Sequence, residues 1–311
     1  MMSKQMQGNL MLLVTALIWG LSFTAQRKGM EYIGPFTYNS IRFLIGAAVL
    51  VPVFKLMDAR RAANPDIHPS REEQNRQQHH LRVGGLLCGL ALFAGSTLQQ
   101  LGILYTTAGK SAFITAFYMV LVPVFSVFLG RRIRPVIWLC VVIAVTGMWL
   151  LTMRGGLSMG RGELLTLICS LGYAAQILLI DKYSPLVDGV RLSAIQFAVT
   201  GLGSIPLMVL FETPHWSQIV SCTVPILYGG IGVCGVAFTF QVLAQKYAEP
   251  TVASLIMCLE SVFGAIFGAL ILHETMRPRE LCGCIILFAA IILSQLPDEK
   301  LPPVLRQRRR T

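Results

Sequence analysis

Glu260 is the residue of this sequence whose position most directly suggests chemistry, because it is the only carboxylate in an apolar run of about residues 253–272. That run is long enough to cross most of a lipid bilayer as a helix. A charge at that depth costs about 2.5–3.5 kcal/mol on insertion scales, so it is expected to face the protein interior or a watery cavity. There it would bind a substrate or a proton, or else pair with a neighbour and fix helix packing. Gly264 and Gly268 follow on the same helical face and predict close approach of another helix.

Polar and aromatic side chains near the middle of other apolar runs are further candidates for substrate binding. Lipid offers their polar groups no hydrogen-bond partner, so each needs one inside the protein. Gln99 and Gln241 could bind substrate through amides that both donate and accept, or could simply connect helices. Trp19 and Tyr173 could stack on a planar or cationic substrate, or pack in the core. The remaining candidates are Tyr118 and Gln176.

Arg42 lies inside the second apolar run and needs a special environment. Its guanidinium cannot lose its proton in a protein, so an anion or several carbonyl groups must lie nearby. We interpret Arg42 as a gating or ion-pair residue in preference to a substrate contact, and Glu260 is one conceivable partner.

No arrangement of residues indicates catalysis or a bound metal. The five histidines fall in linkers or at the ends of apolar runs, and the sequence contains no H-E-x-x-H, G-x-S-x-G or P-loop motif. None of the eight cysteines forms a C-x-x-C pair. The sequence therefore predicts a protein that is not an enzyme and that holds neither a metal nor a cofactor.

The composition indicates a membrane protein. The chain of 311 residues is 54% hydrophobic and only 13% charged, whereas soluble domains are about 25% charged. A net charge of +11 would suggest nucleic acid as the partner of a soluble protein. Here the basic residues lie in short segments between apolar runs, so we expect membrane lipid as a partner and no nucleic acid.

Ten apolar runs predict an all-α membrane protein with ten transmembrane helices. The runs are at about residues 9–27, 36–55, 83–105, 111–130, 135–153, 163–180, 191–211, 222–244, 252–272 and 279–296. Most basic residues outside the runs fall on the side of the N-terminus, so both termini are expected to be cytoplasmic. Residues 58–82 are predicted to be a flexible cytoplasmic linker, and residues 297–311 a basic cytoplasmic tail attracted to anionic lipid.

The two halves of the sequence resemble each other. At an offset of 154 residues, Trp19-Gly20 falls on Tyr173-Ala174 and Arg42-Phe43 falls on Gln196-Phe197. At an offset of 142, Gln99 falls on Gln241. These matches divide the chain into five-helix repeats at 9–153 and 162–296. Because five is odd, the second repeat would have the opposite orientation, and a substrate site is expected near the midplane between the repeats.

Three motifs resemble those of EamA-type transporters in the drug/metabolite transporter superfamily. They are Leu17-Ile-Trp-Gly-Leu-Ser-Phe23, Ile41-Arg-Phe-Leu44, and the segment from Leu259-Glu-Ser-Val-Phe263 to His273-Glu274. The resemblance implies a basket-like 5+5 inverted-topology repeat with a central cavity lined mainly by spans 1, 3, 4, 6, 8 and 9. The chain departs from the family pattern at Ser261, where a proline usually follows the ninth-span glutamate, and at Arg131, where a Gly-Glu pair is usual.

We therefore predict a secondary transporter (carrier) that moves a small organic solute across the bacterial inner membrane by alternating access, in the direction of export. Its small-molecule substrate would be an amino acid, another metabolite or a drug. A polytopic membrane enzyme and a channel-like pore are the alternatives. The sequence leaves open the identity of the substrate, the direction of transport, coupling to protons and the presence of a homodimer.

Overall fold

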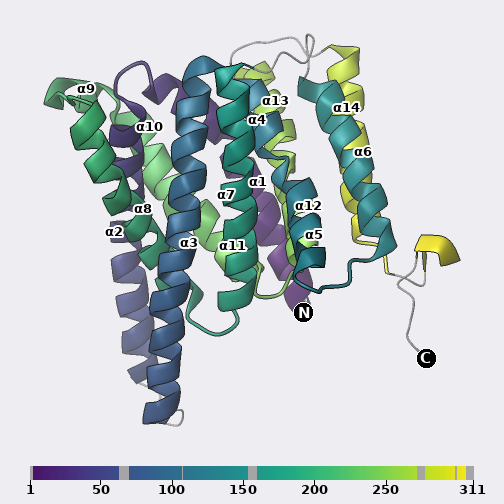
Figure 1. Cartoon of the computed structure of the whole chain (residues 1–311), viewed down its shortest axis with the longest axis horizontal. Coiled ribbons are helices and arrows are strands. Elements are labelled where there is room, and N and C mark those ends of the chain that lie inside the picture. The colour runs from purple at the N-terminus through teal and green to yellow at the C-terminus, as the bar shows by residue number, and fades with distance from the viewer. Residues whose placement is uncertain are drawn as a thin grey trace.

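The computed structural model describes residues 3–62, 70–106, 108–152, 160–271, 277–297 and 300–305. Within these ranges all regular structure is helical, as predicted, and the long helices stand side by side in one bundle (Figure 1). The elements are α1 (Lys4–Gly29), α2 (Pro35–Ala62), α3 (Arg71–Tyr105), α4 (Ala108–Thr115), α5 (Tyr118–Phe128), α6 (Pro135–Thr152), α7 (Arg161–Tyr183), α8 (Gly189–Phe211), α9 (Trp216–Ser221), α10 (Thr223–Leu227), the π-helix η1 (Tyr228–Phe238), α11 (Thr239–Ala244), α12 (Pro250–Met257), α13 (Leu259–Ile271), α14 (Pro278–Ser294) and the short 3-10 helix η3 (Pro303–Leu305).

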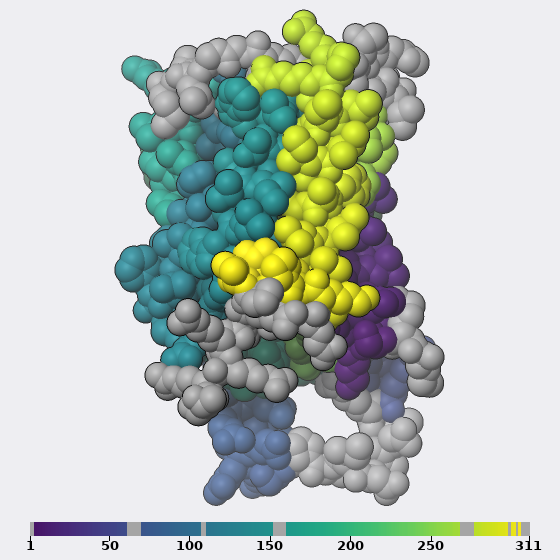
Figure 2. Space-filling model, turned by 90° about the vertical axis from the view of Figure 1, so that its right-hand side faces the viewer, coloured from purple at the N-terminus to yellow at the C-terminus, as the bar shows by residue number. Residues whose placement is uncertain are grey.

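The outer surface of the bundle is apolar enough to face the hydrocarbon of a lipid bilayer. Among the described residues, eight helical stretches are long and apolar enough to cross a membrane, and Pro135–Leu151 is a shorter apolar helix. Large apolar side chains such as Val142, Val209 and Ile285 are well exposed. The face formed by α6 and α14, which run beside each other in Figure 2, carries several of them. The chain is thus a multi-pass membrane protein, while the number of ten crossings stays a prediction.

The connection between the second and third apolar runs is shorter than the sequence predicted. Helix α2 continues to Ala62, and α3 already begins at Arg71 and projects beyond most of the bundle at its lower end (Figure 1). The Ser70 side chain accepts a hydrogen bond from the backbone N–H of Glu73 and caps α3. Much of the predicted flexible linker is therefore helical, and residues 63–69 lie outside the described ranges.

Two of the apolar runs are broken helices. The fourth run is divided into α4 and α5 at Ala116 and Phe117, and the ninth is divided into α12 and α13 at Cys258. The eighth run contains the eleven-residue π-helix η1, which is rich in glycine. Such irregular backbone is tolerated at membrane depth only where protein or a cavity surrounds it.

Helices α2 and α8 run antiparallel and are joined at both ends. At one end, Arg191 donates hydrogen bonds to Asp58 at 2.5 Å. At the other end, Glu212 accepts hydrogen bonds from the backbone N–H groups of Phe36 and Thr37, each at 2.8 Å, and from the Thr37 hydroxyl at 2.6 Å. A carboxylate at this place satisfies the unpaired N–H groups in the first turn of α2 and complements its helix dipole. We refer to these two contacts as the α2–α8 clamps.

Glycine allows close packing between several helices. A Cβ atom on Gly20 of α1 would lie 2.8 Å from the backbone nitrogen of Gly264 in α13, and one on Gly147 of α6 would lie 2.8 Å from the carbonyl oxygen of Gly283 in α14. Only glycine fits such crossings. The small-residue face predicted around Gly264 is thus where α1 packs.

Candidate functional site

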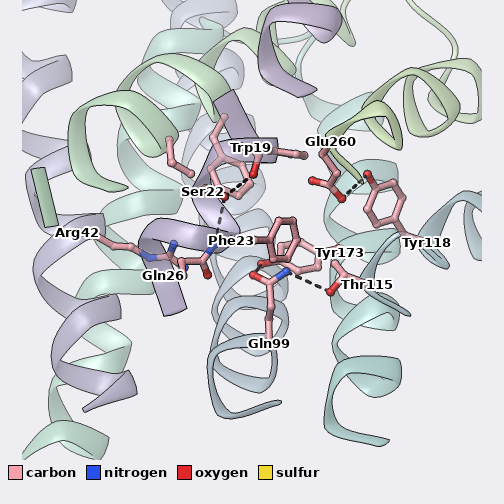
Figure 3. A pocket seen from close by; sticks show the side chains of 12 residues that line it. Trp19, Ser22, Phe23, Gln26, Arg42, Gln99, Thr115, Tyr118, Tyr173 and Glu260 are labelled. Atoms are coloured by element: carbon pink, nitrogen blue, oxygen red, sulfur yellow. Dashed lines mark hydrogen bonds between the residues drawn. The ribbon is translucent and has the colours of Figure 1, made fainter. Parts of the chain in front are cut away.

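A small cavity lies in the middle of the bundle and is lined by residues of α1, α2, α3, α4, α5, α7, η1 and α13 (Figure 3). Its volume is about 30 Å³, which is room for one or two water molecules. The lining is mixed polar and aromatic. It consists of Trp19, Ser22, Phe23, Gln26, Arg42, Gln99, Thr115, Tyr118, Tyr173, Val233, Phe238 and Glu260.

Glu260 lies in the first turn of α13, directly after the break at Cys258. Its side chain is only 3% exposed and accepts a hydrogen bond from the Tyr118 hydroxyl at 3.3 Å. The position just inside a helix N-terminus favours a carboxylate because the backbone N–H groups there carry partial positive charge. Glu260 therefore faces the protein interior and a cavity, as expected from its depth in the apolar run.

Arg42 lines the opposite side of the same cavity (Figure 3). It is 2% exposed, and its Nε donates a hydrogen bond to the side chain of Asn39 at 3.0 Å. The guanidinium carbon lies 4.7 Å from the centre of the Phe43 ring and 5.2 Å from that of Tyr38, within the range of cation–π attraction. Within the described part of the chain, no carboxylate pairs with Arg42. The ion pair considered with Glu260 is thus not formed, since other residues of the cavity separate the two.

Between Arg42 and Glu260 lie a glutamine and several aromatic rings (Figure 3). The Tyr173 hydroxyl donates to Gln99 Oε1 at 2.9 Å, and Gln99 Nε2 donates to the Thr115 hydroxyl at 3.2 Å. The rings of Trp19 and Phe238 are 4.7 Å apart. The Trp19 Nε1 group is buried and has no hydrogen-bond partner among the described residues. The cavity therefore offers an aromatic wall of two tilted rings, with the Trp19 N–H as an unused donor.

Six of the eight candidate residues meet at this cavity: Trp19, Arg42, Gln99, Tyr118, Tyr173 and Glu260. Sequence reasoning missed Ser22, Phe23 and Gln26, although they follow Trp19 at i+3, i+4 and i+7 on one helical face, a spacing that could have identified them. It also missed the lining residues Thr115, Val233 and Phe238, for which the sequence gives no comparable signal.

Gln176 and Gln241 do not line the cavity. They are fully buried and belong to a separate chain of amides, in which Gln241 Nε2 donates to Gln176 Oε1 at 3.3 Å and Gln176 Nε2 donates to Gln196 Oε1 at 3.2 Å. The candidate residues thus fall into two groups, one that lines the cavity and one that is hydrogen-bonded elsewhere in the interior.

Within the described residues, no three His, Cys, Asp or Glu side chains lie close enough together to hold a metal ion. The polar groups of the cavity are amides, hydroxyls, one guanidinium and one carboxylate. Such a set suits the binding of a small polar solute.

Comparison with other proteins points to transport. The model of the EamA-like transporter family matches residues 6–153 and 160–296. An uncharacterized transporter of Archaeoglobus fulgidus is 28% identical over 299 residues, which span 94% of this chain and 87% of that protein. The uncharacterized transporter YvbV of Bacillus subtilis is 27% identical, over 91% of this chain and 90% of its own length. One crystal structure with 17% sequence identity superposes with a TM-score of 0.74, over 93% of this chain and 96% of that chain, so the two share a fold.

Proposed function

The chain belongs to the EamA-like transporter family and is a membrane transporter, and from that premise we propose that it is a carrier that exports a small organic solute across the bacterial inner membrane by alternating access. The observation that carries the proposal is the central cavity. Its lining comes from both segments that match the family model, with Arg42 from the first and Glu260 from the second on opposite sides. A solute bound there would contact both segments, and their relative movement would expose it to either side.

The contacts between the two segments support an inverted repeat of five plus five helices. At the offset of 154 residues, Thr37 corresponds to Arg191 and Asp58 corresponds to Glu212. These four residues form the two α2–α8 clamps, so each clamp is the counterpart of the other. Reciprocal contacts of this kind are expected of two repeats related by a twofold axis in the membrane plane.

The cavity supports the same symmetry. At the offset of 142, Tyr118 corresponds to Glu260 and Ala116 corresponds to Cys258. Tyr118 and Glu260 are hydrogen-bonded to each other, and the helix breaks fall at Ala116 and Cys258. Corresponding residues in contact indicate that the proposed axis passes close to this hydrogen bond. Broken helices at corresponding positions next to a polar site are also a common feature of secondary transporters.

Glu260 is proposed to be the coupling or recognition group, with Trp19, Gln99, Tyr118 and Tyr173 completing the substrate site. A cavity for one or two waters is smaller than an amino acid, so the carrier must widen it before a solute binds. The aromatic wall, the guanidinium of Arg42 and the carboxyl group of Glu260 favour a solute with an apolar body and polar ends.

Transport by purified protein in proteoliposomes tests the proposal. A panel of radiolabelled amino acids, nucleosides and cationic drugs should include a solute whose uptake saturates and shows counterflow. Chemical conversion of the solute would favour a membrane enzyme. Uptake that rises linearly with concentration and shows no counterflow would favour a channel-like pore.

The variant Glu260→Gln tests the role of the carboxylate. We expect at least about a ten-fold fall in the uptake rate, because hydrogen bonds to a charged group are worth about 1.5–3 kcal/mol, with an unchanged amount of protein in the membrane. Glu72→Gln, on the exposed start of α3, is the matched control and should transport normally. A native uptake rate and pH profile in Glu260→Gln would restrict Glu260 to a structural role.

A further inference from the structure

Three glutamines that the cavity does not use form a connected group in the interior. Gln176 of α7, Gln196 of α8 and Gln241 of α11 are each fully buried. Their two hydrogen bonds, at 3.2 and 3.3 Å, connect these three helices. We refer to the three residues as the glutamine triad.

The triad is incompletely satisfied at both of its ends. Gln196 Nε2 and Gln241 Oε1 are buried and have no hydrogen-bond partner within the described part of the chain. Buried polar groups are nearly always bonded, and one left without a partner destabilises the arrangement that buries it. The triad therefore holds one unused donor and one unused acceptor in a closed interior, an arrangement more easily opened than a fully bonded network.

Each member of the triad corresponds to a residue of the cavity. At the offset of 154, Ser22 corresponds to Gln176 and Arg42 corresponds to Gln196, and at the offset of 142, Gln99 corresponds to Gln241. All three corresponding residues, Ser22, Arg42 and Gln99, line the cavity. The triad is thus the counterpart, in the second repeat, of one wall of the open site in the first.

We propose that the glutamine triad is the closed latch of a second, cytoplasm-facing chamber, and that its amides bind the solute when that chamber opens. The proposal rests on the carrier function proposed above. In the present structure the first repeat keeps a small cavity around Arg42, whereas the corresponding part of the second repeat is closed by the hydrogen bonds of the triad. When the repeats exchange conformations, the three amides separate, and the Arg42 side closes.

The two chambers differ in charge. Gln196 stands where the corresponding residue of the open cavity is Arg42. The cytoplasmic chamber therefore offers amide donors and acceptors but no guanidinium of its own, and Glu260, near the proposed axis, is shared by both. A solute in the cytoplasmic chamber is recognised through neutral hydrogen-bonding groups, such as amides or hydroxyls, in addition to any group that meets Glu260.

Paired cysteine reporters test the latch without altering the triad. Gln26 lines the open cavity, and Ile180, which corresponds to it at the offset of 154, is buried on the triad's helix α7. Seven of the eight native cysteines are buried and Cys282 is exposed, so Cys282→Ser gives a suitable background. Gln26→Cys and Ile180→Cys are introduced separately. A membrane-impermeant thiol reagent is applied to right-side-out vesicles for Gln26→Cys and to inside-out vesicles for Ile180→Cys.

Adding Gln176→Leu removes both hydrogen bonds of the triad. We expect the labelling rate of Ile180→Cys to rise about five- to ten-fold, as the population shifts towards the cytoplasm-open state, and that of Gln26→Cys to fall. Gln100→Leu is the control, because Gln100 is also fully buried, lies outside the triad, and has an amide without a hydrogen-bond partner among the described residues. It should leave both labelling rates unchanged.

Unchanged labelling rates with Gln176→Leu would overturn the latch, because the triad would then serve only to pack the helices. Labelling rates that rise at both reporters would also overturn it, because they would indicate a general loss of packing in place of a shift between two states. Should that variant fail to fold, Gln241→Leu removes one hydrogen bond only and should shift both rates in the same opposite directions by less. With the triad intact, rapid labelling of both reporters at once would indicate a continuous pore. That result would contradict the carrier function itself and is distinct from failure of the latch.

Discussion

At the scale of single residues, the interior is built from polar groups that lipid could not satisfy. Arg42 shows how such a group is accommodated: its Nε donates a hydrogen bond to Asn39, and its guanidinium carbon lies over the rings of Tyr38 and Phe43. Aromatic rings and one amide thus replace the carboxylate that the sequence led us to consider. A buried cation held in this way is free to meet an anionic group that enters the cavity.

Arg42→Lys should not be tolerated, although it keeps the charge. Lysine can reproduce neither the contact of the guanidinium with the two rings nor the hydrogen bond from Nε. We expect a destabilisation of about 1–3 kcal/mol, seen as a lower melting temperature of the protein in detergent, together with loss of uptake. Arg76→Lys, on the exposed part of α3, is the matched control. If Arg42→Lys melts and transports like the native protein, the geometry of the guanidinium is unimportant.

Residue positions in the sequence predicted which side chains are buried better than which of them meet. Six candidates meet at the cavity because a polar group deep in an apolar run must face the protein interior or a cavity, since lipid cannot satisfy it. Gln176 and Gln241 were expected there too, but they are bonded to each other in a closed part of the interior. Their placement depends on how two distant segments pack, which spacing along one helix does not encode.

At the scale of helices, the apolar runs predicted where helices occur. The predicted helix boundaries were wrong where polar residues extend a helix beyond its apolar run. The start of α3 could have been predicted from the sequence, because Ser70 and Glu73 have the spacing of a helix N-cap and its capping-box partner. The breaks at Ala116 and Cys258 carried none, because neither residue disfavours helix strongly. Both breaks lie next to residues that line the cavity, Thr115 and Glu260.

The crossing of α1 and α13 should depend on Gly20. An added Cβ would lie 2.6 Å from Phe263 Cβ and 2.8 Å from the Glu260 carbonyl oxygen, so Gly20→Ala forces the helices apart. We expect a destabilisation of about 1–3 kcal/mol from overpacking, measured as a lower melting temperature, and reduced uptake because Glu260 moves. Gly232→Ala is the control, since its nearest neighbour would be at an ordinary 3.6 Å. Equal melting temperatures for the two variants would refute the close crossing.

The two α2–α8 clamps should contribute unequally to stability. Glu212 accepts three hydrogen bonds at the partly buried start of α2, whereas both side chains of the Asp58–Arg191 pair are more than one-third exposed. We expect Glu212→Ala to destabilise by about 1–2 kcal/mol and Asp58→Ala by less than about 1 kcal/mol. Thermal unfolding in detergent ranks the two, and the reverse order would contradict this account.

At the scale of the whole molecule, the proposed topology places both ends of the chain in the cytoplasm. Helix α1 begins and α14 ends at the lower end of the bundle in Figure 1, where α2 and α3 also project. Green fluorescent protein fused after the last residue should fluoresce, because it does not fold after export through the general secretory route. Alkaline phosphatase fused after residue 156 should be active, because that segment is expected outside. Inactive phosphatase there, or a dark C-terminal fusion, would reverse the orientation.

The π-helix η1 gives the eighth apolar run a property that an ordinary helix lacks. Its hydrogen bonds span one residue more than those of an α-helix, and it supplies Val233 and Phe238 to the cavity while α11, directly after it, supplies Gln241 to the triad. One residue turns an α-helix by about 100°. Conversion of η1 into an α-helix would therefore rotate Val233 and Phe238 of the cavity wall relative to Gln241 and the rest of α11. A single backbone transition would then change the orientation of residues that line both proposed chambers.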